Sequence, residues 1–224
     1  MKTTTIAVGA YEENCTILET NGKTLVVDPG AEADTILAAL DRAGLVPDAI
    51  LVTHGHFDHI GGIPGLRSRW PTLRILVNDT DAKILSHPFN QSPPEYPPFP
   101  AGIPTEPPER YADEFGYTVI PTPGHTPGGV CYHFAKDNLL LSGDTLFCGS
   151  VGRTDFPGGD MAALMDSLQR LKTLPDNTRV VPGHGPETTI GAEKRGKFEP
   201  EAVADYISAL LAEGIFRRSQ ALNA

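Results

Sequence analysis

Cysteine is scarce in this sequence, with Cys15, Cys131 and Cys148 as the three examples in 224 residues. The number is odd and no C-x-x-C spacing occurs, so the sequence offers neither a disulfide framework nor a thiolate zinc motif. We expect all three to be free thiols that are buried as small apolar side chains, in a protein of a reducing compartment.

Long apolar runs and basic clusters are lacking as well. No apolar stretch approaches the roughly 18–20 residues that a membrane-spanning helix needs, and residues 1–5 lead into no apolar signal segment. The formal net charge is −10, whereas nucleic-acid binding requires clustered Lys and Arg. The sequence therefore predicts a soluble cytoplasmic protein that binds neither nucleic acid nor a membrane, and it leaves the oligomeric state open.

The remaining composition is typical of a globular α/β protein. Apolar residues make up 40% and charged residues 21% of the chain, and no repeat or linker divides it, so residues 1–224 are predicted to form one domain. Asn21-Gly22 between two apolar runs predicts a hairpin of residues 15–18 and 24–27. Apolar residues at helical spacing predict the helices Ala33–Ala43 and Met161–Leu171. Further predicted strands are 49–52, 73–77, 117–120, 130–134, 139–141 and 179–181, with helices at 80–85 and 201–216.

Residues 86–110 contain nine of the 21 prolines. Proline fixes φ and has no N–H, so this segment is neither a regular helix nor a central strand. A long loop of this kind is either a lid over a site or a surface insertion without a role, and both interpretations stay open.

Five of the seven histidines follow apolar, strand-type segments and lie beside glycine. One segment runs into His-Gly-His-Phe-Asp-His at residues 54–59, two others into Pro-Gly-His, and a fourth into Ser-Gly-Asp. Strand ends meet at one edge of an α/β sheet, and glycine permits close approach. Seven such side chains are too many for one tetrahedral metal but suit two ions that share a carboxylate. The candidate ligands are His54, His56, Asp58, His59, His125, Asp144 and His184.

Other polar residues have weaker claims to a role. His87 and His133 are expected to be structural. Arg153 is expected to form an ion pair with Asp155 rather than to contact substrate directly, although substrate contact stays open. The basic cluster Lys194, Arg195 and Lys197 lies nearest the last histidine and is either a solvated surface or a contact for an anionic substrate.

The seven candidate ligands resemble the signature of the metallo-β-lactamase superfamily. The segments at 123–129 (PGHTPGG), 143–147 (GDTLF), 152–156 (GRTDF) and 182–189 (PGHGPETT) resemble its glyoxalase II-like branch. The resemblance implies a four-layer αβ/βα sandwich of two mixed β-sheets flanked by helices. It also implies a first metal on His54, His56 and His125, a second on Asp58, His59 and His184, and a bridging Asp144.

Members of that branch hydrolyse glutathione thioesters, so the resemblance implies a thioesterase acting on S-lactoylglutathione or a related acylglutathione. We expect two divalent metal ions, zinc in the first place with iron or manganese as alternatives. A metal-activated hydroxide would attack the thioester while Asp58 orients it. About 40 residues follow His184, so the helical C-terminal domain of full-length glyoxalase II is expected to be missing, as in the short, single-domain type.

Several alternatives remain at this point. A related branch, the persulfide dioxygenases, also carries a Gly-Arg-Thr-Asp-Phe segment and would hold one iron on His54, His125 and Asp144. A lactonase or phosphodiesterase of the same fold stays open, whereas a β-lactamase fits less well because it usually lacks the bridging aspartate. A non-catalytic metal-binding module of the same fold is the alternative from another class.

Overall fold

The computed structural model describes residues 1–195. The predicted helix at 201–216 and Lys197 lie outside the described residues. The described strands form two five-stranded sheets and a two-stranded ribbon, with the orders β1-β2-β3-β4-β5, β12-β11-β8-β7-β6 and β10-β9.

Both large sheets mix parallel and antiparallel pairs. In the first sheet β3 is parallel to β4 and β4 to β5, whereas β1, β2 and β3 pair antiparallel. Its strands are β1 (Lys2–Val8), β2 (Glu13–Thr20), β3 (Lys23–Val27), β4 (Ala49–Leu51) and β5 (Arg74–Leu76). In the second sheet β8 is parallel to β11. Its strands are β6 (Thr118–Pro121), β7 (Val130–Phe134), β8 (Leu139–Gly143), β11 (Arg179–Pro182) and β12 (Thr188–Thr189), and the ribbon consists of β9 (Leu146–Phe147) and β10 (Ser150–Val151).

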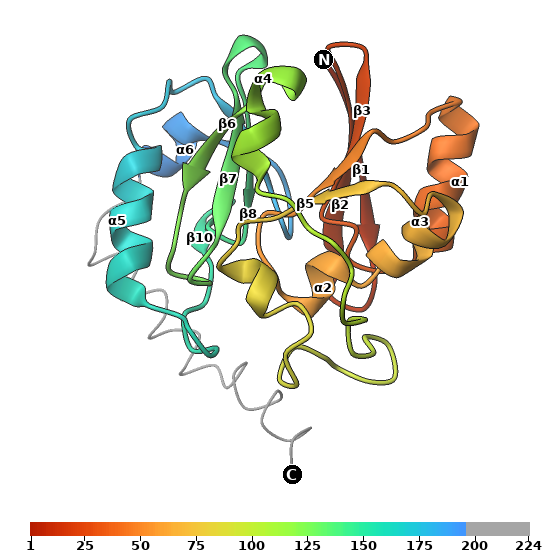
Figure 1. Cartoon of the computed structure of the whole chain (residues 1–224). Helices are drawn as coiled ribbons and strands as arrows, with labels where there is room; N and C mark the ends of the chain where they lie inside the picture. Colours follow the sequence, from red (N-terminus) through yellow and green to blue (C-terminus); the bar gives the residue numbers. More distant parts are fainter. Residues whose placement is uncertain (196–224) are drawn as a thin grey trace.

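Helices cover the outer face of each sheet (Figure 1). α1 and α3 lie on the first sheet, and α5 lies on the second. The α-helices are α1 (Ala33–Ala43), α2 (Phe57–Ile60), α3 (Ile63–Arg69), α4 (Ala112–Phe115), α5 (Met161–Leu171) and α6 (Ile190–Lys194), and the 3₁₀ turns are η1 (Asp81–Lys83), η2 (Pro108–Tyr111) and η3 (Ala135–Asp137).

Three apolar clusters separate the four layers. The central cluster joins Leu25 and Leu51 of the first sheet to Tyr132 and Leu141 of the second. A second cluster packs Ile36 of α1 against the outer face of the first sheet, and a third packs α5 against the second sheet. The described residues thus have the αβ/βα layers that the resemblance implies.

Most elements predicted from residue patterns are confirmed. The helices Ala33–Ala43 and Met161–Leu171 have the predicted bounds. β2 and β3 form the predicted hairpin, in which Asn21 (φ 51°) and Gly22 (φ 72°) adopt the positive φ angles of a type I′ turn. The predicted helix at 80–85 is shorter, because only residues 81–83 form a 3₁₀ turn.

Residues 86–107 of the proline-rich segment form an irregular loop, as predicted, and η2 begins at Pro108. Two of its residues attach it to the turn between β1 and β2. Tyr96 is 1% exposed and packs its ring against Tyr11 at 5.6 Å between centroids, and Glu95 accepts a hydrogen bond from the Ala10 N–H at 2.8 Å.

One prediction about cysteine is wrong. Cys15 and Cys131 are buried free thiols as expected, but Cys148 is exposed. It lies in the tight turn between β9 and β10, where its side chain reaches the surface.

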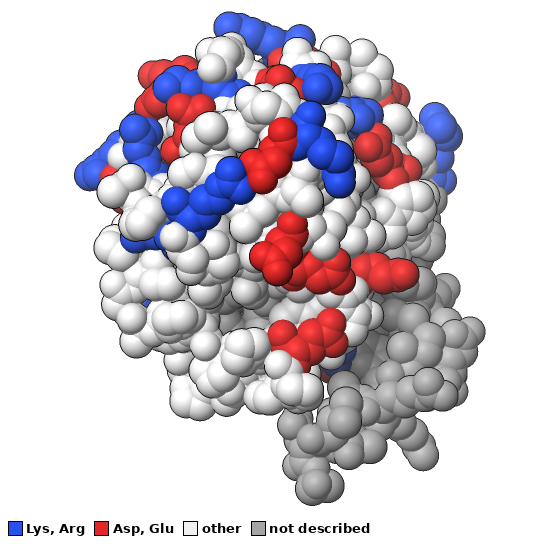
Figure 2. All heavy atoms as spheres, turned by 90° about the vertical axis from the view of Figure 1, so that its right-hand side faces the viewer, with Lys and Arg blue, Asp and Glu red and all other residues white. Residues whose placement is uncertain are grey.

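The face formed by α1 and α3 carries charged side chains of both signs next to one another (Figure 2). Arg69 of α3 and Asp41 of α1 form a two-pronged pair at 2.7 and 2.8 Å. Exposed pairs of this kind add little stability.

None of the described helices is both long and apolar enough to cross a membrane.

Candidate metal centre

The predicted ligands lie at the carboxyl ends of strands from both sheets. β4 ends just before the 54–59 segment, β8 ends just before Asp144, and β11 ends just before His184. β6, which leads to His125, is antiparallel to β7, and β7 is antiparallel to β8, so β6 and β8 point the same way. Within the second sheet the strand directions therefore bring these residues to one edge, and there they meet the 54–59 segment of the first sheet.

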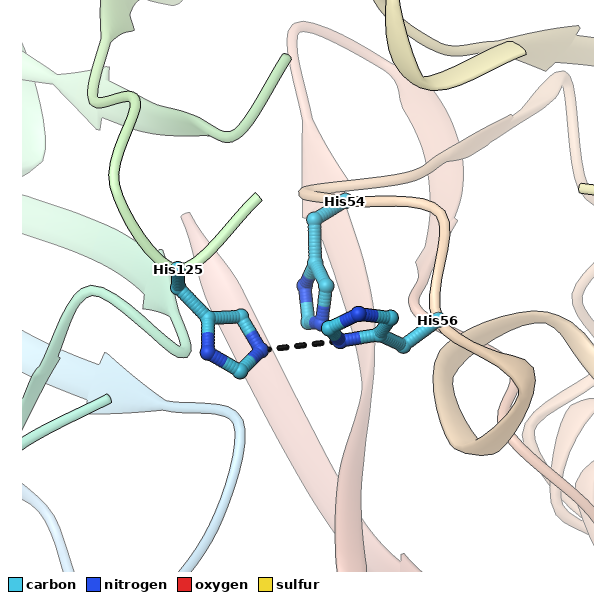
Figure 3. Close-up of side chains that lie close together, drawn as sticks. All are labelled: His54, His56 and His125. Carbon is cyan, nitrogen blue, oxygen red and sulfur yellow. Dashed lines mark hydrogen bonds between the residues drawn. The ribbon is translucent and has the colours of Figure 1, made fainter. Parts of the chain in front are cut away.

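His54, His56 and His125 form one compact group (Figure 3). They are 2%, 4% and 5% exposed. His56 Nδ1 and His125 Nε2 are 2.9 Å apart, and the ring centroids of the three residues lie 4.6–4.8 Å from one another. Three imidazoles that converge on one point are a typical zinc or iron site.

Asp58, His59 and His184 form a second group. Asp58 and His59 reach it because the chain turns into α2 immediately after His56. His184 Nε2 lies 3.5 Å from Asp58 Oδ2. This group is more open than the first, because the His184 side chain is 25% exposed.

The Asp144 carboxylate lies between the two groups. Its Oδ1 is 3.3 Å from His59 Nε2, and its Oδ2 is 3.5 Å from His125 Nε2 and 3.7 Å from His184 Nε2. One carboxylate thus faces histidines of both groups, which is the position of a bridging ligand.

The unsatisfied atoms of the site fit metal ions. His54 Nε2, His59 Nε2 and Asp144 Oδ1 are buried and have no hydrogen-bond partner among the described residues. Such groups cost free energy unless something binds them. Close backbone approach supports the same conclusion, because a Cβ on Gly183 would lie 2.2 Å from Asp144 Oδ1 and 2.7 Å from His59 Cε1.

The protonation states of His54 and His56 suit metal binding, whereas the neighbouring Asp144 and Asp28 raise the pKa of His59 well above its usual value, against the effect of burial. Burial lowers the pKa of His54 well below its usual value and lowers the pKa of His56 to about 3. Burial alone would raise the pKa of Asp144, but the neighbouring His59 and His184 bring it well below its usual value. Neutral imidazole and ionised carboxylate are the forms that bind a metal.

Comparison with known proteins places this arrangement in a family. The sequence profile of the metallo-β-lactamase superfamily matches residues 8–184. The chain belongs to that superfamily. The predicted resemblance and fold are thereby confirmed.

Relatives within the superfamily include proteins named as hydroxyacylglutathione hydrolases. GloC of Haemophilus influenzae is 34% identical over 205 residues, a match covering 85% of this chain and 93% of that protein. The enzyme of Xanthomonas axonopodis is 38% identical over 181 residues, covering 80% of this chain and 64% of that protein.

Solved structures that share the superfamily fold at more than 25% identity include TTHA1623 and ETHE1. TTHA1623 in a di-iron-bound form has a TM-score of 0.76 and 37% identity, with 88% of this chain and 98% of that chain covered. ETHE1 from Myxococcus xanthus has a TM-score of 0.66 and 27% identity, covering 87% of this chain and 82% of that chain.

Two buried carboxylates lie behind His59, and neither was among the predicted site residues. Asp28 accepts hydrogen bonds from His59 Nδ1 at 3.0 Å, from the Thr53 N–H at 2.7 Å and from Thr53 Oγ1 at 2.6 Å. Glu13 is fully buried, with Oε1 3.8 Å from His59 Nδ1. Asp28 could have been found, because it directly follows β3, which is parallel to β4 and so points to the same edge. Glu13 stands at the start of β2 and has no comparable signal.

The predicted basic residues have different surroundings. Arg153 forms the expected ion pair, with Nε 2.6 Å from Asp155 Oδ1, and its guanidinium lies 4.1 Å from the Phe156 ring centroid. Phe156 in turn lies 5.3 Å from the His56 ring, so this loop borders the metal centre. Lys194 instead binds Asp176 at 2.6 Å, and Arg195 is exposed at the end of α6.

His87 and His133 lie outside the two metal-facing groups. The His87 ring packs against Phe89 at 4.4 Å between centroids, and His133 is partly buried on β7. The structural roles expected for both stay predictions.

Proposed function

We propose that the chain is a metal-dependent hydrolase that cleaves a thioester, with S-lactoylglutathione or a related acylglutathione as substrate. The observation that carries this proposal is the set of seven metal-type side chains, in which the Asp144 carboxylate lies between the other six. The names of the Haemophilus and Xanthomonas relatives support glutathione thioesters as the substrate class. The match covers 93% of GloC, which supports an enzyme of the short, single-domain type.

The proposed ligands are divided between two metal positions. His54, His56 and His125 would hold the first metal, Asp58, His59 and His184 the second, and Asp144 would bridge them. A bound metal pair supplies a hydroxide nucleophile, because it lowers the pKa of water from ~15.7 toward ~7, and it polarises the substrate carbonyl.

Asp58 is the residue proposed to orient the nucleophile and hold its proton. Burial alone would raise the pKa of Asp58, but the hydrogen bond to His184 and the nearby His59 lower it overall, so the carboxylate is ionised and able to accept a proton. The leaving group is a thiol with a pKa of about 8.5 in solution, so it needs little help from an acid. A site without an additional general acid therefore suits a thioester.

Aromatic residues on both sides of the centre would contact the substrate. Tyr11 is 48% exposed and packs against Phe57 at 5.7 Å between ring centroids. Phe156 and the guanidinium of Arg153 lie on the His56 side. Arg153 pairs with Asp155, so it would contact a substrate at the edge of the site without adding a net positive charge there.

Metal analysis of the purified protein combined with a rate on S-lactoylglutathione tests the proposal. We expect two metal ions per chain and rapid hydrolysis that a chelator abolishes and added zinc, iron or manganese restores. Hydrolysis that persists after complete metal removal contradicts the metal mechanism. Two bound metals without turnover of any glutathione thioester contradict the substrate and favour the non-catalytic module.

A persulfide dioxygenase with one iron is the second candidate. The Gly-Arg-Thr-Asp-Phe segment at 152–156 supports it, and the di-iron form of TTHA1623 shows that a similar protein holds iron. Oxygen uptake with glutathione persulfide, measured with an oxygen electrode on protein that contains one iron, distinguishes this activity from thioester hydrolysis.

A further inference from the structure

Asp81 is a buried carboxylate directly behind the three-histidine group. It begins η1 and is 0% exposed. Its Oδ2 accepts hydrogen bonds from the Gly55 N–H and from Thr126 Oγ1, both at 2.8 Å, and its Oδ1 accepts one from the Gly128 N–H at 2.6 Å. No sequence motif points to this residue.

The three donors belong to the two loops that carry the histidines. Gly55 lies between His54 and His56, and Thr126 follows His125. The first loop leaves β4 in one sheet, and the second leaves β6 in the other. A single carboxylate thus connects segments that are about 70 residues apart in the chain and that must meet to form one metal position.

The backbone is shaped for this contact. A Cβ on Gly128 would lie 2.6 Å from Asp81 Oδ1, and a Cβ on Gly55 would lie 2.9 Å from the Asp81 carbonyl oxygen. The carbonyl of Gly55 is held as well, because it accepts a hydrogen bond from Asn90 Nδ2 at 2.7 Å. Both polar groups of the Gly55 backbone therefore have buried partners outside the metal centre.

We propose that Asp81 is a positioning residue that holds the His54–His56 loop and the His125 loop in the geometry that the first metal requires. This inference rests on the proposed metal centre. All three partners are donors, so the site needs an acceptor at both oxygens. A carboxylate provides this, whereas an asparagine would turn its NH₂ group toward at least one N–H or O–H. Residues that orient metal ligands in this way contribute about 10- to 100-fold to metal affinity.

The test compares two proteins that both carry His184→Ala, one with Asp81 and one with Asp81→Asn. His184→Ala removes a ligand of the second metal position and leaves the three-histidine position intact. Zinc affinity is measured by competition with a chromophoric chelator, and cobalt absorption reports the ligand geometry. We expect Asp81→Asn to weaken binding at this position about 10- to 100-fold and to alter the cobalt spectrum. Asp48→Asn is the matched control, because Asp48 also accepts a backbone hydrogen bond, from the Thr24 N–H at 2.9 Å, but touches no ligand loop.

Unchanged zinc affinity in the folded Asp81→Asn protein overturns the inference. A weaker affinity in Asp48→Asn of the same size also overturns it, because the effect would then be general. If Asp81→Asn fails to fold, Thr126→Val removes one of the three donors and is expected to weaken binding severalfold; unchanged binding contradicts the inference. If the wild-type protein binds no metal, the proposed centre itself fails, which is a distinct result.

Discussion

Three histidines face the Asp144 carboxylate through Nε2, and a hydrogen bond from Nδ1 orients each of their rings. His125 Nδ1 donates to the Arg153 carbonyl at 2.7 Å, and His184 Nδ1 donates to the Tyr11 carbonyl at 2.9 Å. His59 Nδ1 donates to Asp28 at 3.0 Å. These bonds leave Nε2 of each ring facing the centre, so the tautomers are set before a metal binds.

Asp58 is the residue whose charge the proposed reaction needs most. Asp58→Asn keeps the size of the side chain but cannot accept a proton, so we expect turnover of S-lactoylglutathione to fall about 100-fold or more. The rate is compared at equal metal content, determined for each preparation. Asp34→Asn, an exposed change in α1, is the control and should keep the full rate. Normal turnover of Asp58→Asn at full metal occupancy would rule out its assigned role.

The three thiols should differ in reactivity. Burial raises the pKa of Cys131 to about 11 and raises the pKa of Cys15 well above its usual value, whereas Cys148 is exposed. Because the thiolate is the reactive form, we expect one fast-reacting thiol per folded chain with a disulfide reagent and three after denaturation. Cys148→Ser should remove the fast reaction. A rapid reaction that remains in this variant contradicts the burial of the other two.

At the scale of elements, the start of α5 connects helix stability to the metal centre. The Asp160 side chain caps the helix by accepting a hydrogen bond from the Ala163 N–H at 3.1 Å. Its own N–H donates to the Gly124 carbonyl at 2.8 Å, next to His125. The cap therefore also positions the chain beside one ligand.

Loss of this cap should destabilise the protein. We expect Asp160→Ala to lower the free energy of unfolding by about 1 kcal/mol, measured by urea denaturation of the metal-free protein. Asp166→Ala removes the same carboxylate from an exposed position within α5 and should change stability by less than about 0.5 kcal/mol. Equal effects of the two substitutions would contradict the capping role.

At the scale of the whole molecule, the metal centre joins the edges of two sheets whose facing surfaces pack mainly through apolar side chains. A metal that binds only the folded chain stabilises it, by about 2.7 kcal/mol when its free concentration is 100 times the dissociation constant. We expect chelation to lower the thermal unfolding temperature and metal addition to restore it in proportion to the logarithm of its concentration. An unfolding temperature that does not depend on metal would show that the ligands do not bind a metal in the folded state.

Local patterns were sufficient for elements whose signals lie within a few residues. The helices at 33–43 and 161–171 and the turn at Asn21-Gly22 were predicted correctly, because helical spacing and positive-φ residues act locally. β1 was not predicted as a strand. Its seven residues include three consecutive threonines and are mostly exposed on the edge of the sheet, so they lack a strong apolar alternation.

The sequence by itself determined the chemical nature of the centre, because His-Gly-His-Phe-Asp-His and three later strand ends name the candidate ligands. Only the tertiary structure decided what orients them. Asp28, Asp81 and the Tyr11 carbonyl act on ligands from other parts of the chain. The physical reason is that hydrogen bonds between distant segments depend on how the two sheets pack, and a single carboxylate or a backbone carbonyl leaves no periodic signal in the sequence.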